Sequence, residues 1–324
     1  MGQADTLTKE YMKDPEVFAD AFNYYIYDGE QVIHPEQLNE LDTASLAVLF
    51  GDSSDNKKNE QIQVYRDILK SVTAMEDGKA TYLILGIENQ MKINYAMPVR
   101  NMLYDALQYY LQVKTIAKIN RKSENTLTGD EFLSGITKDD KLLPMITLVV
   151  YFGMDPWDGP KSLHEMLMVK DAKVLAYTAD YKINLIDPVV MPDEDLVKLR
   201  SDLKEVFAFI KCAKDKDKLR ALIENNEAFH NMKRFTAEMI KTITNINIEF
   251  KEEEDRVDMC LAIEQMREES RAMGQAIGET IGEARGKSLG LAEGKSIGVA
   301  EVLKNLGISE AEYQRILKEK ENAQ

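Results

Sequence analysis

Asp67 and Glu88 are the two residues of this sequence best suited to bind a divalent metal ion together. Residues 82–87 form an apolar run that ends abruptly in Glu88, Asn89 and Gln90. An uncompensated buried carboxylate is unfavourable, so this ending predicts that Glu88 faces a cleft, a partner or a cation. Asp67 lies in a second strand-like run, and residues 76–79 predict a β-hairpin turn between the two runs. The hairpin would place both carboxylates on neighbouring strands.

Paired carboxylates on adjacent strands are suited to phosphodiester cleavage. They can hold Mg²⁺ or Mn²⁺ while leaving coordination sites for a phosphate oxygen and a water molecule. The backbone carbonyl of Asn89 could supply a further ligand. Gln90 shares a strand face with Glu88 and its amide can orient a water, but it cannot stabilise anionic charge as Lys would. The alternative is structural: Glu88 and Gln90 form the polar end of a strand, and Asp67 pairs with a basic neighbour.

Residues 97–113 predict an amphipathic helix after this strand. Arg100, Tyr104 and Gln108 recur every four residues and therefore share one helix face. This face could meet a phosphate backbone, with Arg100 and Tyr104 as substrate contacts, or it could be an exposed polar face. A different set forms the apolar stripe expected to pack on the interior: Met102, Leu103, Ala106, Leu107, Tyr110 and Leu111.

The elements before this site begin with a helix. Residues 14–27 carry apolar residues at helical spacing, with Asp14 as the N-cap and Pro15 at the first helical position. A short strand is expected at residues 31–33, followed by loop up to the hairpin at 62–90.

The elements after the site complete an α/β pattern and then become helical. A central strand is expected at residues 142–152 and a further strand at 181–186. Between them, Ser162 and Glu165 predict a capping box that opens a short helix at 163–169. Charged helical segments follow at residues 193–211, 214–224, 225–244 and 252–272.

The C-terminal part contains a four-residue repeat. Glycine occurs at every fourth position from Gly274 to Gly298, and the residue two positions after each glycine is also small. Each glycine lowers helix stability by about 1 kcal/mol relative to Ala, so a helix here would need close self-packing along its small residues. A low-complexity linker is the equal alternative. Residues 302–324 predict a helical hairpin with Gly307 as a C-cap.

Composition narrows the classes of function. The chain has 324 residues and a formal net charge of −15, which argues against broad electrostatic capture of nucleic acid. Residues 114–122 are locally basic and could contact DNA, or they form a solvated helix end. No apolar run approaches the roughly 20 residues of a membrane helix, and no signal pattern begins the chain. The two distant cysteines fit a reducing cytoplasm.

Several segments together resemble a known family. The αββαβ order, with Asp67 on one strand and Glu88-x-Gln90 ending the next, looks like a PD-(D/E)xK nuclease core. More narrowly, the chain resembles the recombination-promoting nuclease and putative transposase family of bacteria over most of residues 5–270. The segments that carry the resemblance are residues 18–25, 65–70, 85–90, 97–100 with Tyr104, and 163–167.

The resemblance implies Mg²⁺-dependent DNA cleavage, with a role in DNA exchange or mobile-element biology. Asp67 and Glu88 match the metal-binding acids of the family, and Gln90 occupies the position of the superfamily Lys. Asp20 lies on the first helix, where the superfamily often places an extra acid; a solvated helix face is the alternative.

We therefore expect a restriction-endonuclease-like αββαβ core with a helical second half and a helical C-terminal tail. The expected parts are a nuclease-like domain (residues 1–190), a helical region (191–272), the glycine repeat (273–301) and a helical hairpin (302–324). The predicted function is a cytoplasmic, metal-dependent DNA endonuclease that forms homo-oligomers through its tail. The alternatives are a nuclease-fold protein that binds or regulates without catalysis, and an oligomeric scaffold.

Overall fold

The chain folds as two units, each described by itself. A computed structural model describes residues 3–41, 44–47, 62–65, 67–76, 79–122, 127–246, 248–250 and 254–321. The first unit is Met1–Leu261 and the second is Ala262–Gln324. The helices between residues 191 and 261 belong to the first unit, so the boundary expected at residue 190 does not separate two compact units.

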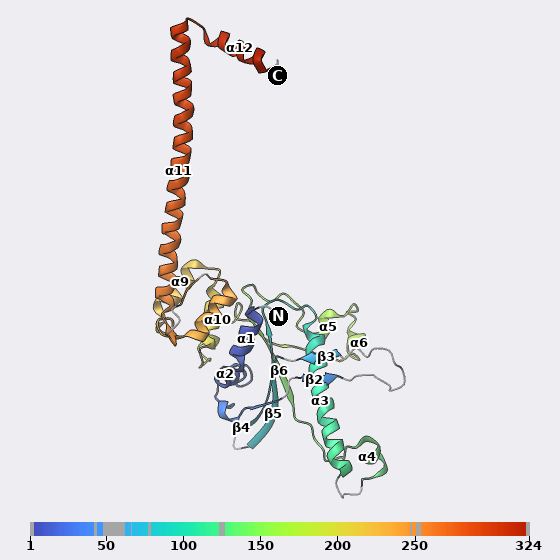
Figure 1. Cartoon of the computed structure of the whole chain (residues 1–324). Coiled ribbons are helices and arrows are strands. Elements are labelled where there is room, and N and C mark those ends of the chain that lie inside the picture. Colours follow the sequence, from blue (N-terminus) through green and yellow to red (C-terminus); the bar gives the residue numbers. More distant parts are fainter. Residues whose placement is uncertain are drawn as a thin grey trace. The chain divides into compact units, whose positions relative to one another are not determined.

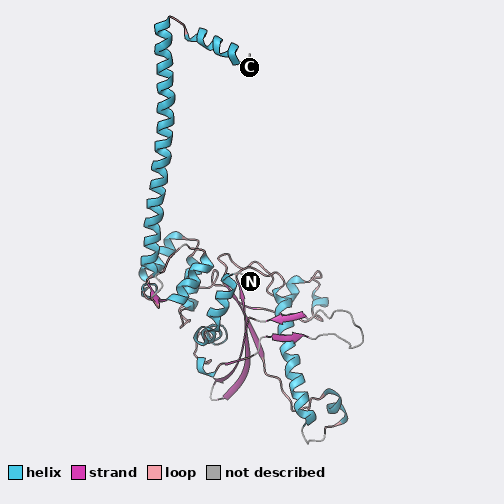
Figure 2. Cartoon of the chain, viewed as in Figure 1, coloured by secondary structure: helices cyan, strands magenta, loops and turns pink. Residues whose placement is uncertain are grey.

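A five-stranded mixed sheet organises the first unit, and its strands β4, β5 and β6 are labelled in Figure 1 and coloured as strands in Figure 2. Its order is β1-β4-β5-β6-β7. Strands β4 and β5 form the predicted antiparallel hairpin, whose residues 77–78 lie outside the described residues, while β5, β6 and β7 run parallel. The mixed sheet confirms the α/β class. The strand bounds are β1 Asn39–Glu40, β4 Ile68–Glu76, β5 Lys79–Gln90, β6 Met145–Tyr151 and β7 Asn184–Ile186.

The strand expected at residues 31–33 is wrong. This segment is irregular because the buried side chain of Asn23 binds its backbone: Asn23 Oδ1 accepts hydrogen bonds from the amides of Val32 and Ile33, and Asn23 Nδ2 donates to the Ile33 carbonyl. These side-chain bonds replace the ladder that a strand would form.

Helices cover both faces of the sheet (Figure 1). Helices α1 (Gln3–Lys13) and α2 (Pro15–Tyr27) lie on one face, and α3 (Met97–Lys122) lies on the other. The start of α2 is as predicted, because Asp14 Oδ1 accepts a hydrogen bond from the Glu16 amide at 2.8 Å. None of the described helices combines the length and the apolar character that a membrane crossing requires.

Helix α3 packs with the opposite face to the one predicted. Met102, Leu103, Tyr110 and Leu111 are 36–50% exposed, and within the predicted apolar stripe only Leu107 is buried. The buried face is half polar and consists of Met97, Pro98, Asn101, Tyr104, Asp105, Leu107, Gln108 and Ala117.

Asp105, on the inward face of α3, forms hydrogen bonds with the sheet and with the segment before β7. Asp105 Oδ1 accepts a bond from Thr147 Oγ1 of β6 at 2.6 Å, and Asp105 Oδ2 accepts one from the Tyr181 hydroxyl. A satisfied polar group can be buried without a large penalty, so these bonds allow Asp105 to turn inward.

The remaining elements of the first unit are short. The capped helix predicted at residues 163–169 is a single turn, in which Ser162 Oγ accepts the Glu165 amide. Their bounds are η1 Pro35–Gln37, β2 Ala44–Ala47, β3 Ile62–Tyr65, α4 Gly129–Ser134, α5 Leu163–Met166, α6 Ala172–Leu175, α7 Asp193–Leu196, α8 Leu203–Cys212, α9 Lys216–Asn225, η2 Glu227–His230, β8 Met232–Lys233, α10 Arg234–Thr244 and β9 Arg256–Val257.

The glycine repeat is helical. It lies within α11 (Met259–Leu306), a helix of 48 residues, which rules out the irregular linker for this segment. A Cβ atom added at each glycine of the repeat would meet nothing within 4 Å. Gly307, at φ +67°, ends α11 as predicted, and α12 (Glu310–Glu321) follows.

Replacing Gly278, Gly282 and Gly286 together by Ala should slow amide hydrogen exchange along α11. Each replacement fills open space and stabilises a helix interior by about 1 kcal/mol. The control is Gly307→Ala, which forces a side chain into the left-handed region and should speed exchange around residue 307. Unchanged or faster exchange in the triple variant would contradict open surroundings at these glycines.

Candidate active site

The hairpin register brings Asp67 beside Glu88. Ile68 pairs with Ile87 and Leu69 with Gly86, so continuing the register by one residue places Asp67 level with Glu88. Residues directly opposite in an antiparallel pair point to the same face of the sheet. Asp67 is not itself in a strand, but its Oδ2 accepts a hydrogen bond from the Asn89 amide at 2.9 Å. The two acids therefore meet where the hairpin ends.

A pocket of about 590 Å³ opens at this end of the hairpin. It is lined by residues from four parts of the first unit: the start of α1, the residue before β4, the end of β5 with the segment after it, and the first turn of α3. The lining residues are Ala4, Asp5, Asp67, Asn89, Gln90, Met91, Lys92 and Arg100.

Arg100 lines this pocket and also pairs with Glu88, which is not among the lining residues. The Glu88 side chain is fully buried, and its Oε2 is 3.2 Å from Arg100 Nη2. Arg100 Nε donates a hydrogen bond to the Tyr104 hydroxyl at 2.9 Å, and the guanidinium lies over the Tyr104 ring. Arg100 and Tyr104 share one helix face, as predicted from their i, i+4 spacing, and they contact each other. Tyr104 is buried and positions Arg100, so it is not an exposed substrate contact.

The pKa values of these groups follow from burial and neighbouring charge. Burial alone lowers the pKa of Arg100, but Glu88 and Tyr104 raise it above its ordinary value, so the guanidinium remains charged. Burial, followed by the charge of Glu88, raises the pKa of Tyr104 and keeps its hydroxyl protonated. Tyr104 is therefore a poor proton acceptor.

Asp67 is less ready to ionise than an ordinary carboxyl. Burial raises its pKa, and the nearby Asp5 charge acts in the same direction. The Asn89 amide, Lys9 and Arg100 oppose this effect without cancelling it. A cation in the pocket would favour the ionised form of Asp67.

The donors around the pocket fit a hard divalent cation. Asp5 and Asp67 line the pocket with carboxylate oxygens, which Mg²⁺ and Mn²⁺ prefer, and Glu88 adds a buried carboxylate that pairs with the lining residue Arg100. The side-chain Oδ1 and Nδ2 atoms of Asn89 are buried and find no hydrogen-bond partner among the described residues. Asn89 follows Glu88 directly on β5, so the two side chains point to opposite faces of the sheet, and the backbone carbonyl of Asn89 stays the predicted further ligand.

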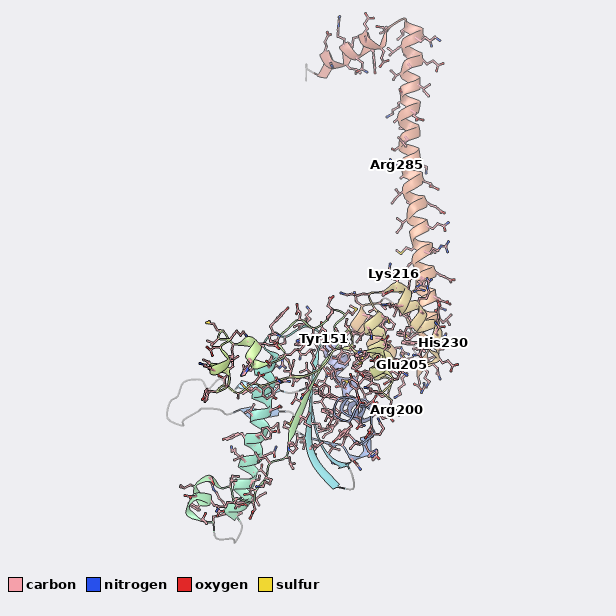
Figure 3. The ribbon with its side chains drawn as sticks, turned by 180° about the vertical axis from the view of Figure 1, so that it is seen from behind. Tyr151, Arg200, Glu205, Lys216, His230 and Arg285 are labelled. Atoms are coloured by element: carbon pink, nitrogen blue, oxygen red, sulfur yellow. The ribbon has the colours of Figure 1, made fainter. Side chains whose placement is uncertain are left out.

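Asp20 does not belong to this site. Its buried carboxylate accepts hydrogen bonds from the amides of Arg200 (labelled in Figure 3) and Ser201, at 2.8–3.0 Å, and from Ser201 Oγ at 2.6 Å. These bonds tie α2 to the turn before α8 and occupy the lone pairs that a metal would need. Neither the metal role nor the solvated helix face expected for Asp20 is supported.

Two pocket residues were missed from the sequence. Asp5 comes from α1, a helix that was not predicted, and is an acid that lines the pocket, as Asp20 is not. Lys92 lies two residues after Gln90 and brings an ammonium group to the pocket that Gln90 cannot replace. The spacing Glu88-x-Gln90-x-Lys92 was visible in the sequence and could have indicated Lys92.

A family model described as putative transposase, YhgA-like, matches residues 5–239. The chain belongs to the YhgA-like putative transposase family. The match confirms this part of the resemblance found from the sequence and includes every pocket residue from Asp5 to Arg100. No curated protein and no solved structure matches the chain significantly. The glycine repeat lies outside the matched residues of this YhgA-like chain.

In this YhgA-like protein, Asp67→Asn should leave the metal-free melting temperature at pH 7 unchanged or raised. An acid whose folded pKa is raised destabilises the fold once pH passes its ordinary value of 3.8, and the amide has no such effect. Any gain should shrink as the pH falls towards 3.8, because protonation removes the same penalty. Thermal melts at several pH values in chelator test this, and a large loss of stability at pH 7 would contradict it.

Arg100→Gln should lower the free energy of unfolding by about 1–3 kcal/mol, because it removes the ion pair of a buried carboxylate. The double variant Arg100→Gln/Glu88→Gln should recover much of this loss, as a double-mutant cycle in urea would show. Arg121→Gln, at the exposed end of α3, is the control. Equal stability of Arg100→Gln and wild type would show that Glu88 does not depend on this ion pair.

Proposed function

We propose that this protein is a metal-dependent DNA endonuclease in which Asp67 and Glu88 bind Mg²⁺ or Mn²⁺. The observation that carries the proposal is the register of the β4–β5 hairpin, which places Asp67, a lining residue of the pocket, level with the buried Glu88. The bound ion would polarise a phosphodiester and activate a water molecule. Asp5 and the backbone carbonyl of Asn89 would add oxygen donors, while Glu88 is held on a central strand of the sheet.

Arg100 has two roles in this proposal. Without metal, its guanidinium neutralises Glu88. Its side chain is 38% exposed and lines the pocket, so it can turn towards a phosphate once a divalent ion takes over the charge of Glu88. Arginine suits this role because its fork of donors matches phosphate oxygens.

Gln90 and Lys92 together take the two roles of the lysine found in the superfamily, which are to orient water and to stabilise negative charge. The Gln90 amide orients the attacking water, and the Lys92 ammonium stabilises negative charge on the phosphate. Both residues line the pocket with Asp67. Gln90 cannot stabilise anionic charge, and in this proposal Lys92, two residues further along the chain, does so.

DNA is the substrate that agrees best with the family, whose description is putative transposase. Transposition requires phosphodiester cleavage and strand transfer, so the pocket would serve mobile-element or recombination chemistry. The net charge of −15 confines DNA contact to local basic groups. The exposed C-terminal turns of α3, including Lys114, Lys118 and Arg121, are the basic surface for this contact. Self-association through the helical tail remains part of the proposal.

Binding without cleavage is the second candidate function. The Arg100–Glu88 ion pair favours it, because the guanidinium of Arg100 already neutralises the buried carboxylate and leaves less need for a metal ion. In that case the nuclease-like core would recognise DNA or regulate a partner.

Plasmid nicking in Mg²⁺ or Mn²⁺ tests the two functions. Wild type should nick DNA, and Glu88→Gln or Lys92→Ala should each reduce the rate by about 100-fold or more. Asp139→Asn, which changes an exposed acid outside the pocket, should match wild type. DNA binding without nicking in wild type would favour the second candidate, and equal nicking by Glu88→Gln would exclude the assigned site.

A further inference from the structure

A second group of metal-binding side chains lies apart from the pocket residues. It consists of His230, at the end of η2, together with Asp258 and Cys260 at the start of α11. One ligand atom from each residue lies within 4.8 Å of the others. His230 is labelled in Figure 3. None of these residues lines the pocket of Asp67, so the cluster requires its own explanation.

The β8–β9 ribbon brings these residues together although they are distant in sequence. Met232 pairs with Val257 in antiparallel register. His230 precedes this ribbon on one side and Asp258 follows it on the other, and His230 Nδ1 lies 3.2 Å from Asp258 Oδ2. The same ribbon is held by a hydrogen bond from Arg256 Nη1 to the Asn231 carbonyl at 2.7 Å.

Buried neighbours fix the backbone under the cluster. Phe229, Met232, Val257 and Met259 are all at most 5% exposed, and they adjoin or alternate with the three polar residues. Core side chains of this kind hold their backbone in one position, so the three ligand atoms are presented from a rigid surface.

Asp258 already has two separate contacts. Its Oδ1 accepts a hydrogen bond from the Leu261 amide at 2.9 Å and so caps α11, while its Oδ2 lies 3.2 Å from His230 Nδ1. One oxygen can therefore keep the cap while the other binds a cation. A His–Asp hydrogen bond at a helix cap would explain these two residues, but it gives no reason for a thiol beside them.

The donor types select zinc over magnesium. Mg²⁺ requires oxygen ligands in octahedral geometry, whereas imidazole, carboxylate and thiolate together are typical of tetrahedral Zn²⁺. Metal–ligand bonds of about 2.0–2.3 Å imply ligand–ligand separations of about 3.3–3.8 Å. The three ligand atoms now lie within 4.8 Å of one another, so side-chain rotations that move them about 1 Å closer together would reach these separations. An ionised Asp and a thiolate would neutralise the ion, and Cys260 forms no disulfide.

We propose that His230, Asp258 and Cys260 form a Zn²⁺ site with water as the fourth ligand. All three residues belong to the first unit, so the ion would fasten the start of α11 to the segment ending in His230. This site is separate from the Asp67 pocket, and it stands whether or not the protein cleaves DNA.

Cobalt substitution in the full-length protein tests the proposal. Metal-free protein is titrated with Co²⁺, which gives thiolate-to-metal charge-transfer absorption only when a cysteine binds it. Wild type should take up one equivalent with this absorption, and Zn²⁺ should displace the cobalt. Cys260→Ser should abolish the charge-transfer band, while Cys212→Ser and Asp67→Asn should retain it.

Two further variants keep the test independent of folding defects. His230→Gln changes an exposed side chain and should weaken Co²⁺ binding by more than the 10–100-fold that loss of an outer-shell partner causes. Asp258→Asn keeps an oxygen for the helix cap and should also weaken Co²⁺ binding. Circular dichroism should show that both variants fold. The proposal is overturned if wild type shows no charge-transfer band, or if the band persists in Cys260→Ser.

Discussion

Compensation of the buried Glu88 carboxylate is the constraint on which the rest of the site depends. Glu88 is fully buried at the end of a central strand, and Arg100 lies 3.2 Å away with its guanidinium charged. For this contact to form, the chain must turn between β5 and α3 so that the first turn of α3 returns over the strand. The Asn94 side chain stabilises that turn by accepting the Ala96 amide at 3.0 Å.

The same constraint explains why α3 turns a polar face inward. With Arg100 fixed over Glu88, residues at helical spacing after it also face the sheet, so Tyr104, Asp105 and Gln108 are buried. Asp105 is then satisfied by Thr147 of β6 and by Tyr181 ahead of β7. The crossover from β5 to β6 is thus held by polar contacts, and the apolar residues Met102, Leu103, Tyr110 and Leu111 remain on the outer face.

Local patterns were sufficient to predict much of this fold. Asp14 and Pro15 marked the start of α2, and the two strand-like runs with a turn at residues 76–79 between them predicted the hairpin that brings Asp67 level with Glu88. The inward face of α3 could not be predicted from periodicity, because its partners Glu88 and Thr147 are distant in sequence. For the same reason the sequence suggested Asp20 as a pocket acid and missed Asp5. The backbone amide of Arg200 that binds Asp20 is 180 residues away in the sequence.

The central claim is that a divalent cation replaces Arg100 as the counter-charge of Glu88. Diffraction from crystals grown with Mn²⁺, with data collected for manganese anomalous scattering, tests this most directly. The account predicts an anomalous peak between the Asp67 and Glu88 carboxylates, at about 2.0–2.2 Å from their oxygens as for other hard cations, with the Arg100 guanidinium moved away from Glu88. A pocket without a peak, with Arg100 still paired to Glu88 at saturating Mn²⁺, would contradict it.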